Sequence, residues 1–198
     1  AVSPADMRRS ILALALQGVL VHQDPNDEPA RMLLERIHSE KAQMVRNGTL
    51  KRVEELVDVK EATPPFGLPD GWEFVALSEI CTSITDGDHL PPPKTESGVP
   101  FLVIGNVRWG GIDFSDIRYV SEEYFAKLDR IRKPRKGDIL YTLVGSFGIP
   151  VLVNVARPFC VQRHIGILRP SSEVSVDFLV YVLASDFVLE QSSAIATG

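Results

Sequence analysis

The sequence predicts an α+β protein, with a helical N-terminal segment over residues 1–62 and a β-rich region over residues 63–198. In the first segment apolar residues recur at helical spacing between charged positions. From Leu68 onward they gather in short runs bounded by Gly, Pro, Asn or Asp, as is typical of strands. With 44% hydrophobic and 24% charged residues, the chain can bury an ordinary globular core.

A first amphipathic helix is expected to begin after Ser3, a suitable N-cap, and to end near Gly18. Pro4 would occupy the first helical position, where its missing N–H is not needed. The acidic first-turn residue and the apolar residues at helical spacing are Asp6, Met7, Ile11, Leu14 and Ala15.

A second, longer helix is expected to begin at Pro29 and to stop at Asn47–Gly48. One side of it carries Leu33, Leu34, Ile37, Met44 and Val45. Such a narrow stripe suits packing against a few other helices, or lying on the surface of its own domain. The charged stretch from Leu50 to Phe66 ends in Pro64–Pro65, which predicts a tether and a domain boundary near residue 63.

The β-rich region contains strand-like runs that are joined mostly by turns. These runs are "GVPFLVIGNV", "GDILYTLVGS", "PVLVNVAR" and "CVQRHIGILRP". Because crossover helices are scarce, a mainly antiparallel or mixed sheet with peripheral helices is expected. One such helix follows Ser121, and a second is expected as one continuous helix over residues 175–194. The chain stops directly after it, so we expect it to be part of a longer protein.

Composition excludes several classes of protein. Cys81 and Cys160 lack CxxC spacing, so free buried thiols are expected in place of a disulfide framework or a zinc knuckle. No apolar run approaches the roughly 20 residues of a membrane span, and no secretory signal is present, so a cytoplasmic protein is expected. The net charge of −5 argues against a general nucleic-acid coat, although basic residues can still cluster locally.

The stretch "SITDGDHLPPP" places Asp86, Asp88 and His89 together ahead of three prolines. The calcium-loop pattern fails at Leu90, and the other histidines offer no zinc spacing, so a metal site is not favoured. A catalytic pair of carboxylates would need a cleft that the sequence does not reveal. A third hypothesis is a rigid tip whose polar side chains reach base edges, with Lys94 reaching a phosphate.

Other polar clusters interrupt the strand-like runs. The run "RIRKPRK" predicts a solvated loop or a set of phosphate contacts, through Arg130, Arg132, Lys133, Arg135 and Lys136. The glycines around Ser146 fit no P-loop, dinucleotide or nucleophile-elbow motif, and a hairpin whose glycines have positive φ is expected. In "VQRHIGIL", strand alternation would put Gln162 and His164 on one face and Arg163 on the other.

In combination and in this order, these stretches resemble the N-terminal half of the specificity subunit of a type I restriction-modification system. The stretches that carry the resemblance are "LPDGWEFVALSEI", "TDGDHLPPP", "GVPFLVIGNV", "KGDILYTLVGSFG" and "FCVQRHIGILRP", ending in "ATG". The opening helices resemble the helical segment that precedes the first target-recognition domain in many such subunits. The resemblance spans essentially the whole chain.

The resemblance implies a DNA reader that is not an enzyme and needs no cofactor. Subunits of this family carry two target-recognition domains, each of which reads one half of a split target, and helices that dock the modification (methyltransferase) subunits. The restriction subunit, a nuclease and translocase, joins that complex. Residues 63–198 would be one target-recognition domain and residues 1–62 the helical segment with its linker. The N-terminal helices could also mediate self-association.

The family shares no fixed base-contacting residues, so the DNA contacts are predicted from chemistry. They are Asp86, Asp88, His89, Lys94, Ser146, Gln162, Arg163 and His164, with Arg130, Arg132, Lys133, Arg135 and Lys136 on phosphates. The "TDGDH" and "GDILYT" stretches recur in the family whatever the target, which favours a role in the fold. Two alternatives stay open: a metal-dependent hydrolase that uses Asp86, Asp88 and His89, and a protein-interaction module that does not bind DNA. Methyl transfer is disfavoured, because neither a cofactor-binding glycine motif nor an Asn-Pro-Pro-aromatic motif occurs.

Overall fold

A computed structural model describes residues 3–50, 66–89 and 92–195, which form two compact units. The first unit holds the described residues up to Thr82, together with residues 171–175 and 185–195. The second holds residues 83–170 and 176–184. The predicted boundary near residue 63, with most of the predicted tether, lies outside the described residues and stays a prediction. Among the described residues, no helix is both long and apolar enough to cross a membrane.

The two N-terminal helices occur where the sequence predicts them. α1 spans Pro4–Leu16, and the Ser3 hydroxyl caps it by accepting a hydrogen bond from the amide N–H of Asp6 at 3.1 Å. α2 spans Ala30–Arg46 and ends at Asn47, after which Gly48 turns the chain with a φ of 68°. These features confirm the cap at Ser3 and both predicted stops.

Polar contacts and the burial of one apolar residue both hold α2 within the first unit. Ile37 is fully buried, whereas Val45 remains 38% exposed. Lys41 donates to the backbone carbonyl of Ser78 at 2.5 Å, at the start of the short helix α3 (Leu77–Ile80). The carboxylate of Glu40 accepts a hydrogen bond from the hydroxyl of Ser172 at 3.0 Å. The last helix of this unit is α6 (Asp186–Ile195).

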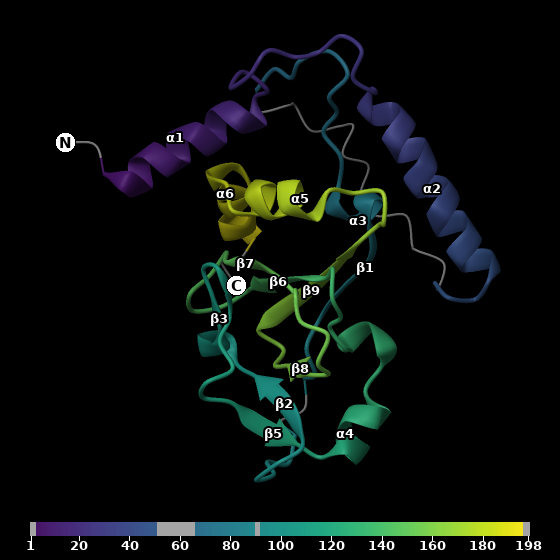
Figure 1. Cartoon of the computed structure of the whole chain (residues 1–198), viewed down its shortest axis with the longest axis vertical. Helices are drawn as coiled ribbons and strands as arrows, with labels where there is room; N and C mark the ends of the chain where they lie inside the picture. The colour runs from purple at the N-terminus through teal and green to yellow at the C-terminus, as the bar shows by residue number, and fades with distance from the viewer. Residues whose placement is uncertain (1–2, 51–65, 90–91, 196–198) are drawn as a thin grey trace. The chain divides into compact units, whose positions relative to one another are not determined.

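A four-stranded sheet forms one half of the second unit's core, in the order β1-β9-β6-β7 (Figure 1). Its strands are β1 (Cys81–Asp86), β9 (Ile165–Pro170), β6 (Ile139–Thr142) and β7 (Pro150–Leu152). β6 is antiparallel to both neighbours, and Leu140 lies opposite Val151 and Ile167. The helix α5 (Val176–Leu183) packs against β7 and buries Leu179 and Leu183.

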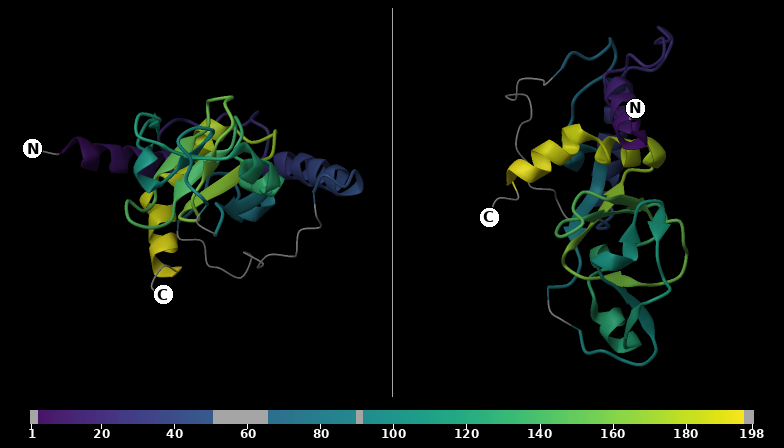
Figure 2. Two further views of the ribbon diagram at one scale, coloured as in Figure 1. Left: turned by 90° about the horizontal axis from the view of Figure 1, so that it is seen from below. Right: turned by 90° about the vertical axis from the view of Figure 1, so that its left-hand side faces the viewer.

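A three-stranded sheet forms the other half, in the order β5-β2-β8. Its strands are β5 (Arg118–Val120), β2 (Val99–Leu102) and β8 (Cys160–Val161), with β2 antiparallel to β5 and parallel to β8. The helix α4 (Glu122–Lys127) lies beside this sheet (Figure 1; Figure 2). Its Tyr124 and Phe125 pack against the buried cluster of Val99, Phe101, Val120 and Cys160. The smaller elements are β3 (Val107–Arg108), β4 (Gly111–Ile112) and the 3₁₀ turns η2 (Ile104–Asn106) and η3 (Arg130–Arg132). Helices around mixed sheets confirm the α+β class.

Two predicted elements are each divided in the structure. The run from Cys160 to Pro170 is not one strand, because the carbonyl of Gln162 accepts from the amide of Ile165 at 3.1 Å and so turns the chain between the sheets. The predicted single C-terminal helix is also wrong, because buried Ser185 interrupts it. Its carbonyl accepts from the amides of Val188 and Leu189 and starts α6. The apolar pattern is the same on both sides of Ser185, so periodicity alone does not reveal the break.

Candidate nucleic-acid interface

Acidic side chains at the end of β1 and in the loop after it hold this loop in place. The carboxylate of Asp86 accepts a hydrogen bond from the guanidinium of Arg132 at 2.7 Å and lies 2.7 Å from Nε2 of His89. Arg132 also donates to the backbone carbonyls of Asp86, at 3.0 Å, and of Gly87. Asp86 and Arg132 are therefore partners of each other within the fold.

Asp88 and Gly87 complete this anchorage. The hydroxyl of Tyr124 donates to the carboxylate of Asp88 at 2.6 Å, and burial, together with this bond, raises the pKa of Tyr124 well above its usual value. Gly87 lies so close to β8 that a Cβ there would be 2.0 Å from the carbonyl oxygen of Val161. The loop thus lies on the sheet edge, where the backbones of Asp88 and Gln162 pair in an isolated parallel β-bridge.

The arrangement of the acidic loop does not favour a metal site. Within the part of the chain that the structure describes, no group of three or more His, Cys, Asp and Glu side chains could hold a metal ion. The carboxylates of Asp86 and Asp88 accept hydrogen bonds from different partners, Arg132 and Tyr124. The hydrolase hypothesis therefore has no ligand set on these residues.

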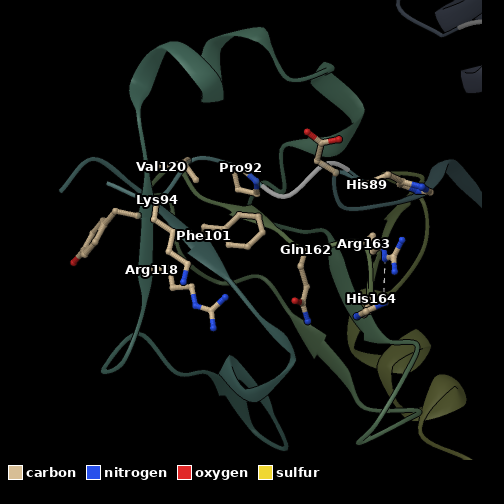
Figure 3. Close-up of a pocket in the computed structure, with 11 residues that line it drawn as sticks. His89, Pro92, Lys94, Phe101, Arg118, Val120, Gln162, Arg163 and His164 are labelled. Atoms are coloured by element: carbon tan, nitrogen blue, oxygen red, sulfur yellow. Dashed lines mark hydrogen bonds between the residues drawn. The ribbon is translucent and has the colours of Figure 1, made fainter. Parts of the chain in front are cut away.

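A groove with a volume of about 340 Å³ opens between this loop, β5 and the turn after β8 (Figure 3). It is lined by Asp88, His89, Pro92, Lys94, Phe101, Arg118, Tyr119, Val120, Gln162, Arg163 and His164. The cations Lys94, Arg118 and Arg163 make no ion pair among the described residues, while the carboxylate of Asp88 is bonded to Tyr124. The groove is therefore locally electropositive in a chain whose net charge is −5.

The turn after β8 brings three of the predicted contact residues together. Gln162, Arg163 and His164 all lie in the turn between β8 and β9 and line the groove. The guanidinium of Arg163 donates to Nε2 of His164 at 3.2 Å, shown as a dashed line in Figure 3. The predicted strand alternation is wrong at this point, since a turn, not a strand face, presents these side chains.

The basic run over residues 130–136 divides into internal and solvent-facing members. Arg132 holds the acidic loop, and Lys133 donates to the carbonyl of Ala126 at 3.0 Å and lies over the ring of Phe125. Arg135 lies 3.9 Å from the carboxylate of Asp138. Among the described residues, Arg130 and Lys136 form no ion pair and are exposed.

The predicted hairpin around Ser146 is confirmed, but it does not line the groove. Gly145 and Gly148 have φ values of 73° and 81°, as the hairpin requires. The Thr142 hydroxyl accepts from the amide of Ile149 at 2.8 Å and donates to the carbonyl of Ser146. Ser146 is exposed at the tip of this loop.

The structure thus separates the predicted contact residues into two groups. Those that line the groove are Asp88, His89, Lys94, Gln162, Arg163 and His164. Those that lie elsewhere are Asp86, Arg130, Arg132, Lys133, Arg135, Lys136 and Ser146. Sequence reasoning missed Arg118 and Phe101, which are register partners on β5 and β2. The three-residue strand that carries Arg118 is too short to give a clear alternation signal.

Comparison with known proteins returns a consistent group of relatives. The chain is 31% identical, over 97% of its length, to the specificity subunit of the type I restriction enzyme EcoEI of Escherichia coli, and spans 32% of that protein. It is 34% identical, over 77% of its length, to the EcoAI specificity subunit of the same organism, and spans 28% of it. The chain therefore covers about a third of the length of these curated relatives.

Structural comparison agrees on the fold. The crystal structure of the HsdS subunit from Thermoanaerobacter tengcongensis matches 97% of this chain and 41% of its own, with a TM-score of 0.50 and 18% identity. No family model matches the chain.

Proposed function

Because this chain belongs to the family of type I restriction enzyme specificity subunits, we propose that it recognises DNA by sequence and reads one half of a bipartite target. The chain would act without catalysis of its own or a cofactor. It would dock the modification subunits, to which methyl transfer belongs, and the restriction subunit would join that complex.

The electropositive groove is the observation that best supports this proposal. Lys94, Arg118 and Arg163 face it without ion-pair partners among the described residues. Hydrogen-bonding groups that can meet base edges, above all the amide of Gln162, line the same groove. DNA recognition requires both kinds of group, because phosphate contacts position a protein and base contacts select the sequence.

Phosphate contacts are proposed for the cations that the fold leaves free to reach solvent. Lys94 and Arg163 lie on a loop and a turn at the groove, and Arg130 and Lys136 are exposed on the basic run. Asp86 and Arg132 bind each other, which supports a role in shaping the loop over direct contact with DNA.

Duplex binding measured as a function of salt, for the chain in complex with its modification subunits, tests the proposal. Affinity should fall linearly on logarithmic axes as salt rises, and selection from random duplexes should enrich a short half-site. The salt slope is the slope of log K against log[salt]. Lys94→Ala and Arg163→Ala should each reduce its magnitude by about one and weaken binding to all sequences alike. Lys127→Ala, on the exposed side of α4 and away from the groove, is the matched control.

Two results would exclude the proposed function. The first is the absence of duplex binding that weakens with salt, which a protein-interaction module that does not bind DNA predicts. The second is an assembly that binds every duplex equally, which would leave no role for the polar groups of the groove.

A further inference from the structure

Arg118 lines the groove from the strand β5 and not from a loop (Figure 3). It is the register partner of Phe101 in the antiparallel pair of β5 and β2. Its guanidinium makes no hydrogen bond or ion pair among the described residues, although the neighbouring backbone is held by strand pairing. A free guanidinium on a firmly placed backbone is suited to directional hydrogen bonding.

Gln162 flanks the same central strand from the other side. Its amide N–H donates to the carbonyl of Leu102 at 3.0 Å, which places it directly beyond the parallel pair of β2 and β8. Figure 3 shows the side chains of Arg118 and Gln162 pointing toward the same side of the groove, with Phe101 between them. The side-chain amide of Gln162 also has no hydrogen-bond partner among the described residues. Because this amide is neutral, it cannot attract a phosphate by charge.

We propose that Arg118 and Gln162 form the base-reading pair of this chain, with Arg118 on a guanine and Gln162 on an adenine. The inference rests on the proposed function and names the residues that confer its specificity. Arginine pairs bidentately with O6 and N7 of guanine, and glutamine with N6 and N7 of adenine. Lys94 and Arg163, on a loop and a turn that line the groove, contact phosphates of the DNA backbone.

The strand order sets how far apart the backbones of the two residues lie. β5 and β8 both flank β2, so the two backbones are about 10 Å apart across the sheet, at 4.7–4.9 Å for each strand step. Successive base pairs are about 3.4 Å apart along the duplex. This separation corresponds to about three base-pair steps, so both side chains can reach bases of the same half-site.

Selection of duplexes from a random pool by the chain in complex with its modification subunits, followed by competition binding, tests the pair. Arg118→Ala should reduce discrimination at one G·C pair by about 5- to 150-fold while retaining the rest of the motif. Gln162→Ala should do the same at one A·T pair. Arg118→Lys should fail to restore the guanine preference, because lysine lacks the planar fork.

Each outcome separates this inference from the proposed function. If Arg118→Ala weakens all sequences alike and lowers the salt slope as Lys94→Ala does, Arg118 binds phosphate and the inference is wrong, while DNA recognition stands. If the selected motif lacks either a G·C or an A·T pair that responds to these variants, the inference is equally overturned. If the assembly with the wild-type chain enriches no motif, the proposed function itself fails.

Discussion

Arg169 and Asp138 form a buried ion pair, in which Nε donates to one carboxylate oxygen at 2.9 Å and Nη2 to the other at 2.7 Å. Their side chains are only 8% and 2% exposed. The same carboxylate accepts from the amide of Arg135 at 3.0 Å, and Arg169 donates to the carbonyl of Lys133 at 3.1 Å. The pair therefore ties the basic run to β9, which explains the aspartate of the "GDILYT" stretch as part of the fold.

Replacing Asp138 with Asn should lower the free energy of unfolding by about 3–5 kcal/mol, because the buried guanidinium of Arg169 would lose its counter-ion. Urea unfolding measures this change, and Glu96→Gln, an isosteric change on an exposed loop, should have an effect within about 0.5 kcal/mol. Replacing both partners with apolar residues, in Asp138→Leu with Arg169→Met, should cost less than Asp138→Asn alone. Equal losses for Asp138→Asn and Glu96→Gln would contradict a structural role for the pair.

Gly87→Ala should destabilise the protein by about 1–3 kcal/mol, the usual cost of forcing an extra methyl group into a packed site. The added Cβ would meet the carbonyl oxygen of Val161 at 2.0 Å, so the loop would have to leave the sheet edge. Gly105→Ala is the matched control, since nothing lies within 4 Å of its Cβ position and its φ is not positive. Thermal or urea unfolding should find Gly105→Ala close to neutral, and a similar loss in both variants would argue against the close approach.

Arg132→Ala should weaken DNA binding through the loss of the loop's anchor, and it should leave the salt slope unchanged. The guanidinium bonds to Asp86 and to the backbone at Gly87, so its removal frees the loop that carries Asp88 and His89. Arg132→Lys should recover part of the binding, because one charged donor would remain. A slope that falls by about one on Arg132→Ala would instead support the phosphate contact that the sequence predicts for this residue.

The thiol of Cys160 should resist modification in the folded protein. Burial, with a smaller contribution from Asp88, raises its pKa to about 12, and thiolate is the reactive form. Since the folded pKa lies above the unfolded value near 8.5, the associated stability is complete below pH 8.5 and is lost as the pH rises toward 12. In a Cys81→Ala variant, where Cys160 is the sole cysteine, a disulfide reagent at pH 8 should react only after urea is added. Rapid reaction in native buffer would show that the thiol is accessible.

The sequence alone was enough to indicate the family, because the order of the motifs along the chain is characteristic of it. The helix caps at Ser3 and Ser121 were also predictable, since an N-cap depends on residues within one helical turn. The same holds for the hairpin at Gly145 and Gly148, where a local turn requires positive φ. Both cysteines are buried thiols, as their spacing predicts.

The tertiary structure alone decided which polar side chains are used inside the fold and which face the groove. Arg132 and Asp86 are 46 positions apart, and Asp138 and Arg169 are 31 apart, so no local pattern pairs them. Arg118 and Gln162 come together only because β5 and β8 flank β2. Caps and turns are set by neighbours along the chain, whereas partners across a sheet are set by strand order, which depends on the burial of the whole core.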